Sequence, residues 1–145
     1  MSNSFFILCH QDDEFGVFES IYKSIQKKNN IYIFYMTNGV ISKNIDKNKL
    51  SRRDKESLKV LKKLGVKEKN IIFFGRKNNI PTCCLYKNLG KAFRILNQFF
   101  MKIRGNSTIY THAYEGGNED HDACNILISK LIKNNKNIKF AYQFP

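Results

Sequence analysis

The apolar stretch FFILC, residues 5–9, is followed directly by HQDDE, residues 10–14. A short apolar run that ends in polar residues predicts a buried β-strand, because the polar residues cannot continue into a core. His10, Asp12 and Asp13 would then lie together at the end of that strand. Such side chains bind metals and accept protons, but Asp12 or Asp13 could equally cap the helix that follows. A partner elsewhere in the chain is needed to decide between a cap and a site.

Strand and helix patterns alternate along the rest of the chain. Strands are predicted from short apolar runs, and helices from apolar residues spaced by three and four. The predicted strands after the first span residues 31–36, 71–74, 108–111 and 138–142, and the predicted helices span residues 15–28, 51–65 and 89–103 and a segment containing His121. This alternation predicts an α/β fold, a Rossmann-like three-layer sandwich around a mostly parallel sheet of strand order 3-2-1-4-5. Ser51 is expected to cap the second helix, and the polar residues 42–49 to form a loop.

Length and composition predict one domain spanning residues 1–145. No apolar run approaches the roughly 18–20 residues that a membrane-spanning helix needs. Residues 1–4 lack the basic region of a signal peptide, so the expected location is cytoplasmic. The four cysteines, at positions 9, 83, 84 and 124, show no C-x-x-C spacing, and reduced, mostly buried thiols are expected.

The formal net charge of +13 raises the question of nucleic-acid binding. The lysines are spread over several segments and usually stand beside asparagine and isoleucine, which indicates a general compositional bias. No specific nucleic-acid partner is therefore expected. An anionic substrate or a membrane-surface ligand stays open.

A second polar stretch, EGGNEDH at residues 115–121, follows the predicted fourth strand. In the order 3-2-1-4-5 the first and fourth strands are neighbours, so both polar stretches reach the same crevice. His10, Asp13 and His121 would supply two nitrogens and one oxygen, a set that suits Zn²⁺ and leaves a position for water. Asp12 would then take the proton from that water as it attacks a carbonyl.

Four ordered motifs resemble those of the PIG-L/LmbE-like N-acetylglucosaminyl deacetylases, which are zinc enzymes. HQDDE, residues 10–14, resembles their His-Pro-Asp-Asp-Glu signature, and residues 37–39 resemble their Thr-Asn-Gly turn. Arg53-x-x-Glu56, followed by Leu-Gly-Val at residues 64–66, resembles a further motif. Residues 111–123 resemble the second metal motif, so the similarity runs from about Phe5 to Phe144.

The resemblance implies that His10, Asp13 and His121 bind the metal and that Asp12 is the general base. It implies that Arg53 contacts substrate, although an ordinary surface pair with Glu56 explains that residue equally well. Asn38 and His112 are further candidates for substrate binding. Asp120 is expected to orient a metal ligand from behind, with helix capping as the alternative.

Three positions depart from the family pattern. Gln11 replaces the usual proline, which is expected to change only loop stiffness. Asn118 stands where the family commonly has a histidine that stabilises the oxyanion or protonates the leaving amine. An amide cannot transfer a proton near neutrality. Thr82 replaces an acidic residue. The chain also stops shortly after its fifth strand, so it is expected to be truncated, minimal or completed by a partner or a second copy.

The resulting hypothesis is a zinc-dependent hydrolase that removes the N-acetyl group from an N-acetylglucosamine-type sugar or glycoconjugate. Fe²⁺ or another divalent metal is an alternative to zinc. The main rival is a metal-binding relative with impaired catalysis, motivated by Asn118 and the short C-terminus, and the third is a basic nucleic-acid-binding module.

Overall fold

The computed structural model describes residues 2–41 and 47–145. The strands are β1 (Asn3–Leu8), β2 (Asn30–Tyr35), β3 (Ile71–Ile72), β4 (Ser107–His112) and β5 (Ile138–Phe144). The helices are α1 (Glu14–Gln26), α2 (Lys47–Leu64), α3 (Phe74–Asn78), α4 (Leu89–Met101) and α5 (Glu119–Asn134), with short 3-10 turns η2 (Glu68–Asn70) and η3 (Tyr86–Asn88). Strands and helices alternate as the sequence predicts.

All five strands form one parallel sheet in the order β3-β2-β1-β4-β5. The predicted fold class and strand order are therefore confirmed. β1 lies in the centre and pairs with β2 on one side and with β4 on the other. Because parallel strands end at the same edge, the polar residues that follow β1 and β4 are brought together there.

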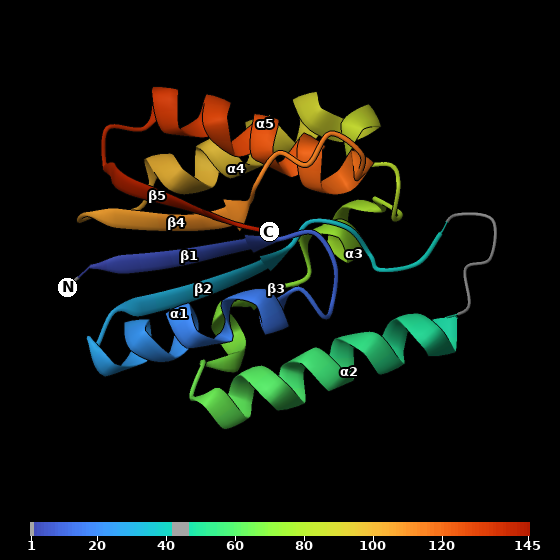
Figure 1. Cartoon of the computed structure of the whole chain (residues 1–145), viewed down its shortest axis with the longest axis horizontal. Helices are drawn as coiled ribbons and strands as arrows, with labels where there is room; N and C mark the ends of the chain where they lie inside the picture. Colours follow the sequence, from blue (N-terminus) through green and yellow to red (C-terminus); the bar gives the residue numbers. More distant parts are fainter. Residues whose placement is uncertain (1, 42–46) are drawn as a thin grey trace.

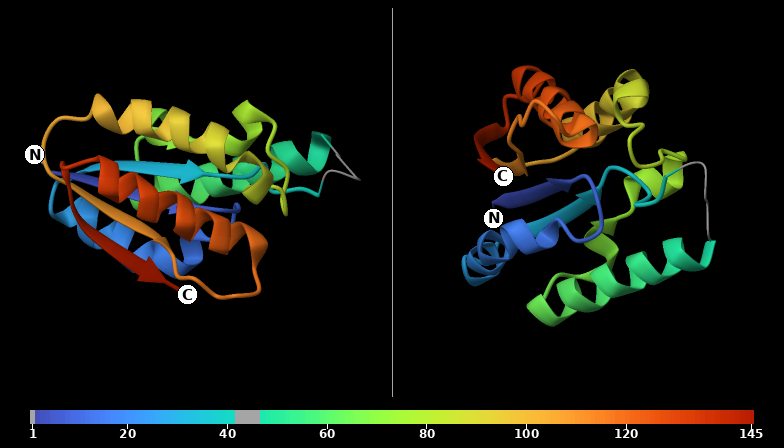
Figure 2. Two further views of the ribbon diagram at one scale, coloured as in Figure 1. Left: turned by 90° about the horizontal axis from the view of Figure 1, so that it is seen from above. Right: turned by 45° about the vertical axis from the view of Figure 1, so that its right-hand side comes forward.

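Helices cover both faces of the sheet, with α1 and α2 on one face and α4 and α5 on the other (Figure 1; Figure 2 gives two further views). Successive side chains of a strand point to opposite faces, and β1 divides its side chains accordingly. Phe5 and Ile7 pack into the core beneath α4 and α5, whereas Phe6 and Leu8 pack into the core beneath α1 and α2. Each of these fully buried side chains contributes about 1.5–3 kcal/mol of hydrophobic stabilisation.

The third strand is shorter than the predicted run 71–74, because the chain turns into α3 at Phe74. Gly75 allows α3 to pack closely against the segment that follows β2. A Cβ atom at Gly75 would lie 2.1 Å from the backbone carbonyl carbon of Thr37, so α3 can approach the segment after β2 this closely only with glycine. The close approach places α3 against the carboxyl edge of the sheet.

The second helix begins earlier than predicted. It starts at Lys47, so Ser51 lies inside α2 and the prediction that Ser51 caps it is wrong. Leu50 is buried in line with Asp54 and Leu61 on the inner side of the helix, which extends the buried stripe by a turn. The predicted loop over residues 42–49 is wrong for residues 47–49, and residues 42–46 lie outside the described residues.

Helices long and apolar enough to cross a membrane do not occur in the described part of the chain. The four cysteines are free thiols; Cys9 and Cys124 are buried, whereas Cys83 is exposed.

Candidate metal centre

An open cavity of about 610 Å³ lies at the carboxyl edge of the sheet. His10, Asp12 and Asp13 reach it from the turn between β1 and α1, and Asn118 and His121 reach it from the start of α5. The two polar stretches are about a hundred residues apart in the sequence. Their meeting follows from the pairing of β1 with β4.

The two carboxylate oxygens of Asp13 have different surroundings. Oδ2 accepts hydrogen bonds from the backbone N–H groups of Cys9 (2.8 Å) and His10 (2.7 Å) and lies 2.9 Å from Nε2 of His112. Oδ1 lies 3.8 Å from Nδ1 of His10 and 4.0 Å from Nε2 of His121. Asp13 is thus anchored through one oxygen and presents the other to two imidazole nitrogens.

The other ring nitrogen of each of these histidines contacts a second carboxylate. Nε2 of His10 lies 3.0 Å from Oδ2 of Asp120, and Nδ1 of His121 lies 2.8 Å from Oε1 of Glu115. Asp120 is buried, and it also accepts hydrogen bonds from the backbone N–H groups of Cys83 (2.7 Å) and Leu85 (3.1 Å). A carboxylate on the rear nitrogen orients the ring and is typical of histidines that bind metals.

Hydrogen bonding shifts the pKa values of this cluster in opposite directions. Burial alone would raise the pKa of Asp13, but hydrogen bonds from His10 and His112 outweigh it and hold that pKa well below the usual range. Burial alone would lower the pKa of His10, but hydrogen bonds to Asp120 and Asp13 outweigh it and raise the pKa to about 9. Without a metal, His10 therefore carries a proton near neutral pH.

Asp12 has an unusual backbone conformation, with φ of 126°. Its Oδ1 lies 3.0 Å from Nη2 of Arg53, and its backbone N–H donates to Oε2 of Glu14 at 2.9 Å. Partial desolvation raises the pKa of Asp12, and the negative charges of Asp13 and Glu14 add to this against the opposing charge of Arg53. A carboxyl group with a raised pKa is a better proton acceptor than an ordinary aspartate.

Three other predicted site residues have mainly structural contacts. Oδ1 of Asn118 caps α5 by accepting from the backbone N–H of His121 at 3.3 Å, although Asn118 also lines the cavity. Oδ1 of Asn38 accepts from the N–H of Val40 at 3.0 Å, and Asn38 is buried. His112 is buried, and its ring stacks on that of His121 at 3.7 Å between centroids. Substrate binding by Asn38 or His112 stays a prediction.

A second possible ligand set overlaps the predicted one. Ligand atoms of Cys9, Asp13, His112 and His121 all lie within 4.8 Å of one another. Sequence reasoning did not include Cys9 or Glu115 in the site. In the sequence, Cys9 looks like the last apolar residue of a strand. Glu115 stands six residues before His121, and this spacing brings the two side chains together only if the intervening loop folds back. Burial raises the pKa of the Cys9 thiol well above its ordinary value, so this sulfur is protonated in the metal-free protein.

Two individual proteins show limited similarity. The chain is 30% identical over 90 residues to an ATP-dependent RNA helicase HrpA of Borreliella burgdorferi; the match covers 62% of this chain and 11% of the helicase. The crystal structure of GalB, the 4-carboxy-2-hydroxymuconate hydratase of Pseudomonas putida KT2440, superposes with a TM-score of 0.59 at 14% identity and supports the fold. That match covers 90% of this chain and 55% of the hydratase chain, so this chain spans only part of either protein.

A family model described as GlcNAc-PI de-N-acetylase matches residues 5–132. The match includes both polar stretches, the Thr-Asn-Gly turn at residues 37–39 and all of the sheet except β5 and the first two residues of β1. It covers far more than half of the chain, and on this ground the chain belongs to the PIG-L family.

Proposed function

We propose that this protein is a metal-dependent hydrolase that removes the acetyl group from an N-acetylglucosamine-type sugar or glycoconjugate, with Zn²⁺ as the metal. The observation that carries the proposal is the arrangement around Asp13. One nitrogen of His10 and one of His121 lie 3.8 Å and 4.0 Å from the same oxygen of Asp13, beside an open cavity. The family description, GlcNAc-PI de-N-acetylase, supports the reaction class.

The donor atoms suit a small divalent ion. Two ligands that are each about 2.0–2.1 Å from a tetrahedral Zn²⁺ lie about 3.4 Å apart. The observed separations of 3.8 Å and 4.0 Å from Oδ1 of Asp13 are close to this spacing. Fe²⁺ accepts the same nitrogen and oxygen ligands and is the alternative.

His10 is preferred over Cys9 and His112 as the third ligand for a catalytic site. His10 lines the cavity, whereas Cys9 and His112 are buried beneath it. Nε2 of His112 is already engaged with Oδ2 of Asp13, and the raised pKa of Cys9 disfavours its thiolate. A set facing the cavity leaves room for water and substrate, as a hydrolytic metal site requires.

When bound, such a metal supplies Lewis acidity that polarises a carbonyl and eases the deprotonation of water. The protein's own groups then handle the proton. Asp12 faces the same cavity and accepts a proton, and its raised pKa also lets the resulting carboxylic acid return that proton to the leaving nitrogen. Arg53 is paired with Asp12 and presents its guanidinium to polar groups of the sugar.

Acetate release tests this proposal. Purified protein with one equivalent of Zn²⁺ is incubated with a panel of N-acetylated sugars, nucleotide-linked sugars and glycolipids, and free acetate is measured. Asp12→Asn should lower kcat by about 10²- to 10⁴-fold, because it removes the general base, with metal content unchanged. His121→Ala should lose the metal. A metal-loaded wild type that releases no acetate from any member of the panel would refute the hydrolase.

A metal-binding relative with impaired catalysis is the second candidate, and Asn118 favours it. The Asn118 side chain caps α5 through its oxygen, and its amide cannot transfer a proton near neutrality. His112 does not replace it, because His112 is buried against Asp13 and Phe144. If a missing proton donor limits the rate, Asn118→His should raise kcat by about 10- to 100-fold. Equal kcat values for the wild type and Asn118→His would mean that Asp12 alone supplies the proton to the leaving group.

A further inference from the structure

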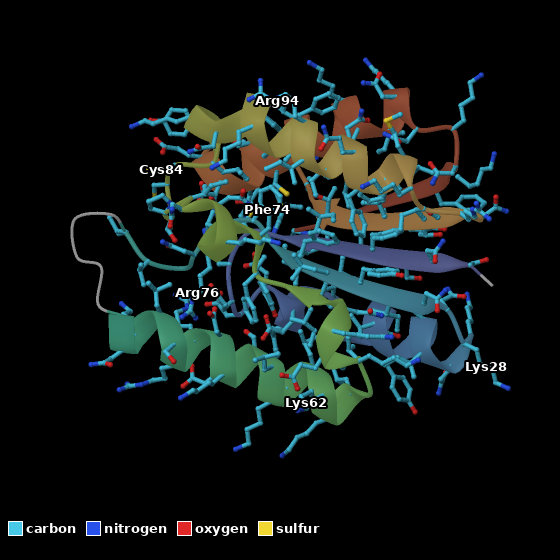
Figure 3. All side chains as sticks on the ribbon, turned by 180° about the vertical axis from the view of Figure 1, so that it is seen from behind. Lys28, Lys62, Phe74, Arg76, Cys84 and Arg94 are labelled. Atoms are coloured by element: carbon cyan, nitrogen blue, oxygen red, sulfur yellow. The ribbon has the colours of Figure 1, made fainter. Side chains whose placement is uncertain are left out.

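Gln11 has a buried side chain although it lies in the turn at the cavity. Only 3% of the residue is exposed. Its Nε2 donates to Oδ1 of Asp54 on α2 at 2.7 Å and to the backbone oxygen of Asn38 at 3.4 Å. Asp54 is itself buried, and its other oxygen pairs with Arg76, which reaches from α3 toward α2 (Figure 3).

The neighbouring residue of α2 holds the main chain of the same turn. Nη2 of Arg53 donates to the backbone oxygen of Gln11 and lies 3.0 Å from Oδ1 of Asp12, while Nη1 donates to the backbone oxygen of Gly39 at 3.1 Å. Arg53 and Asp54 therefore hold the backbone and the side chain of Gln11, respectively. One turn of α2 clamps the residue that precedes Asp12.

This clamp acts where the backbone is strained. A φ of 126° is rarely adopted by residues other than glycine, and it persists only when surrounding contacts hold it. On the other side of Asp12, its N–H is held by Glu14, whose Oε2 also accepts from the hydroxyl of Tyr35 at 2.8 Å. If the contacts of Gln11 were lost, Asp12 would be free to relax toward an ordinary conformation and its carboxylate would move.

We propose that Gln11 and Asp54 are positioning residues that hold Asp12 in the orientation needed to transfer a proton. The inference rests on the proposed function for its catalytic consequence. Neither side chain touches the cavity, so both act through the turn backbone. The hydrogen bond from Gln11 to Asp54 then contributes to kcat, whereas substrate affinity depends on groups that face the cavity.

A charge-swapped pair tests this role. Gln11→Glu places a second carboxylate against Asp54 and should lower kcat by about 10- to 100-fold, since small displacements of catalytic groups carry costs of this size. KM and metal content should change less than about threefold in the same variant. When Asp54→Asn is added, the new amide at position 54 donates a hydrogen bond to the new carboxylate at position 11. This double variant should recover most of kcat. Asp54→Asn alone keeps an acceptor for Gln11 and should have the smaller effect.

A matched control comes from the far end of α5. Asn135 is also a buried amide, and its Nδ2 donates to Oδ1 of Asn97 at 2.9 Å. Asn135→Ala should lower the melting temperature without lowering kcat. If Gln11→Glu loses no more activity than Asn135→Ala at equal loss of stability, or if the double variant folds but recovers nothing, Gln11 and Asp54 do not position Asp12.

A second readout does not depend on activity. The three-bond coupling between the amide and α protons of Asp12, measured by NMR on labelled protein, reports its φ angle. The coupling should change in Gln11→Glu and return in the double variant. If the wild type releases no acetate but the coupling behaves in this way, the hydrolase proposal fails and the positioning inference stands. An unchanged coupling in a folded Gln11→Glu protein would overturn the inference whatever the activity.

Discussion

Nδ1 of His121 lies 2.8 Å from Oε1 of Glu115, on the opposite side of the imidazole ring from the nitrogen that faces Asp13. This contact fixes the ring orientation and keeps Nε2 directed toward Asp13. Glu115→Gln should weaken metal binding by about 10- to 100-fold, the usual effect of losing such a carboxylate. Metal affinity measured by competition with a chromophoric chelator checks this prediction.

Glu119→Gln is the matched control for this variant. Glu119 is an exposed acid at the start of α5, four residues from Glu115. Its substitution by glutamine removes the same charge from the same region. Equal losses of affinity in both variants would mean that Glu115 acts through net charge. A loss confined to Glu115→Gln supports the oriented hydrogen bond.

Asp120 and Asp122 each accept two backbone N–H hydrogen bonds but differ in burial. Asp120 is buried and also contacts His10, whereas the bonds of Asp122 to Glu115 and Gly116 lie at the surface. Asp120→Ala leaves the buried N–H of Leu85 and the ring of His10 without this partner and should destabilise the protein by about 2–4 kcal/mol. Asp122→Ala should cost less than about 1 kcal/mol, because water replaces the lost acceptor. Urea unfolding of both metal-free variants measures the difference.

The alternation of strand and helix patterns in the sequence was enough to predict the fold and part of the site. Once β1 and β4 are neighbours, the polar residues after each strand must share one edge, which is why His10 and His121 could be paired from sequence. The contact of Gln11 with Asp54 could not be anticipated in this way. It depends on the register of α2 against the turn, and that helix begins at Lys47, four residues before the predicted cap at Ser51.

Protonation of His10 should make the stability of the metal-free protein depend on pH. Its pKa is raised from 6.5 to about 9. The proton therefore stabilises the folded state fully below pH 6.5, and this contribution is lost as the pH rises through about 9. The carboxylate of Asp13 has a lowered pKa, so its contribution is lost only in acid and stays constant over this window.

The melting temperature of the metal-free wild type should accordingly fall between pH 6.5 and 9 more steeply than that of His10→Gln. Parallel melting curves would argue against the raised pKa. Metal binding must displace the same proton, so the logarithm of the metal affinity should rise by about one per pH unit up to about pH 9. Calorimetric titrations in buffers of different ionisation enthalpy count the released proton directly.

Gly39 limits the space available to Gln11. It has φ of +78°, and a Cβ atom at this position would lie 2.0 Å from Oε1 of Gln11. Gly39→Ala should therefore force the Gln11 side chain away from Asp54 as well as strain the backbone. We expect a loss of about 1–3 kcal/mol in the free energy of unfolding. We also expect a fall in kcat resembling that of Gln11→Glu.

Gly117→Ala provides the comparison, because a Cβ atom there meets nothing within 4 Å. Its stability should stay within about 0.5 kcal/mol of the wild type. Urea unfolding and acetate release measured on both variants separate the two effects. If Gly39→Ala loses stability but keeps the wild-type kcat, backbone strain at Gly39 is its only consequence. In that case the displacement of the Gln11 side chain does not change the position of Asp12.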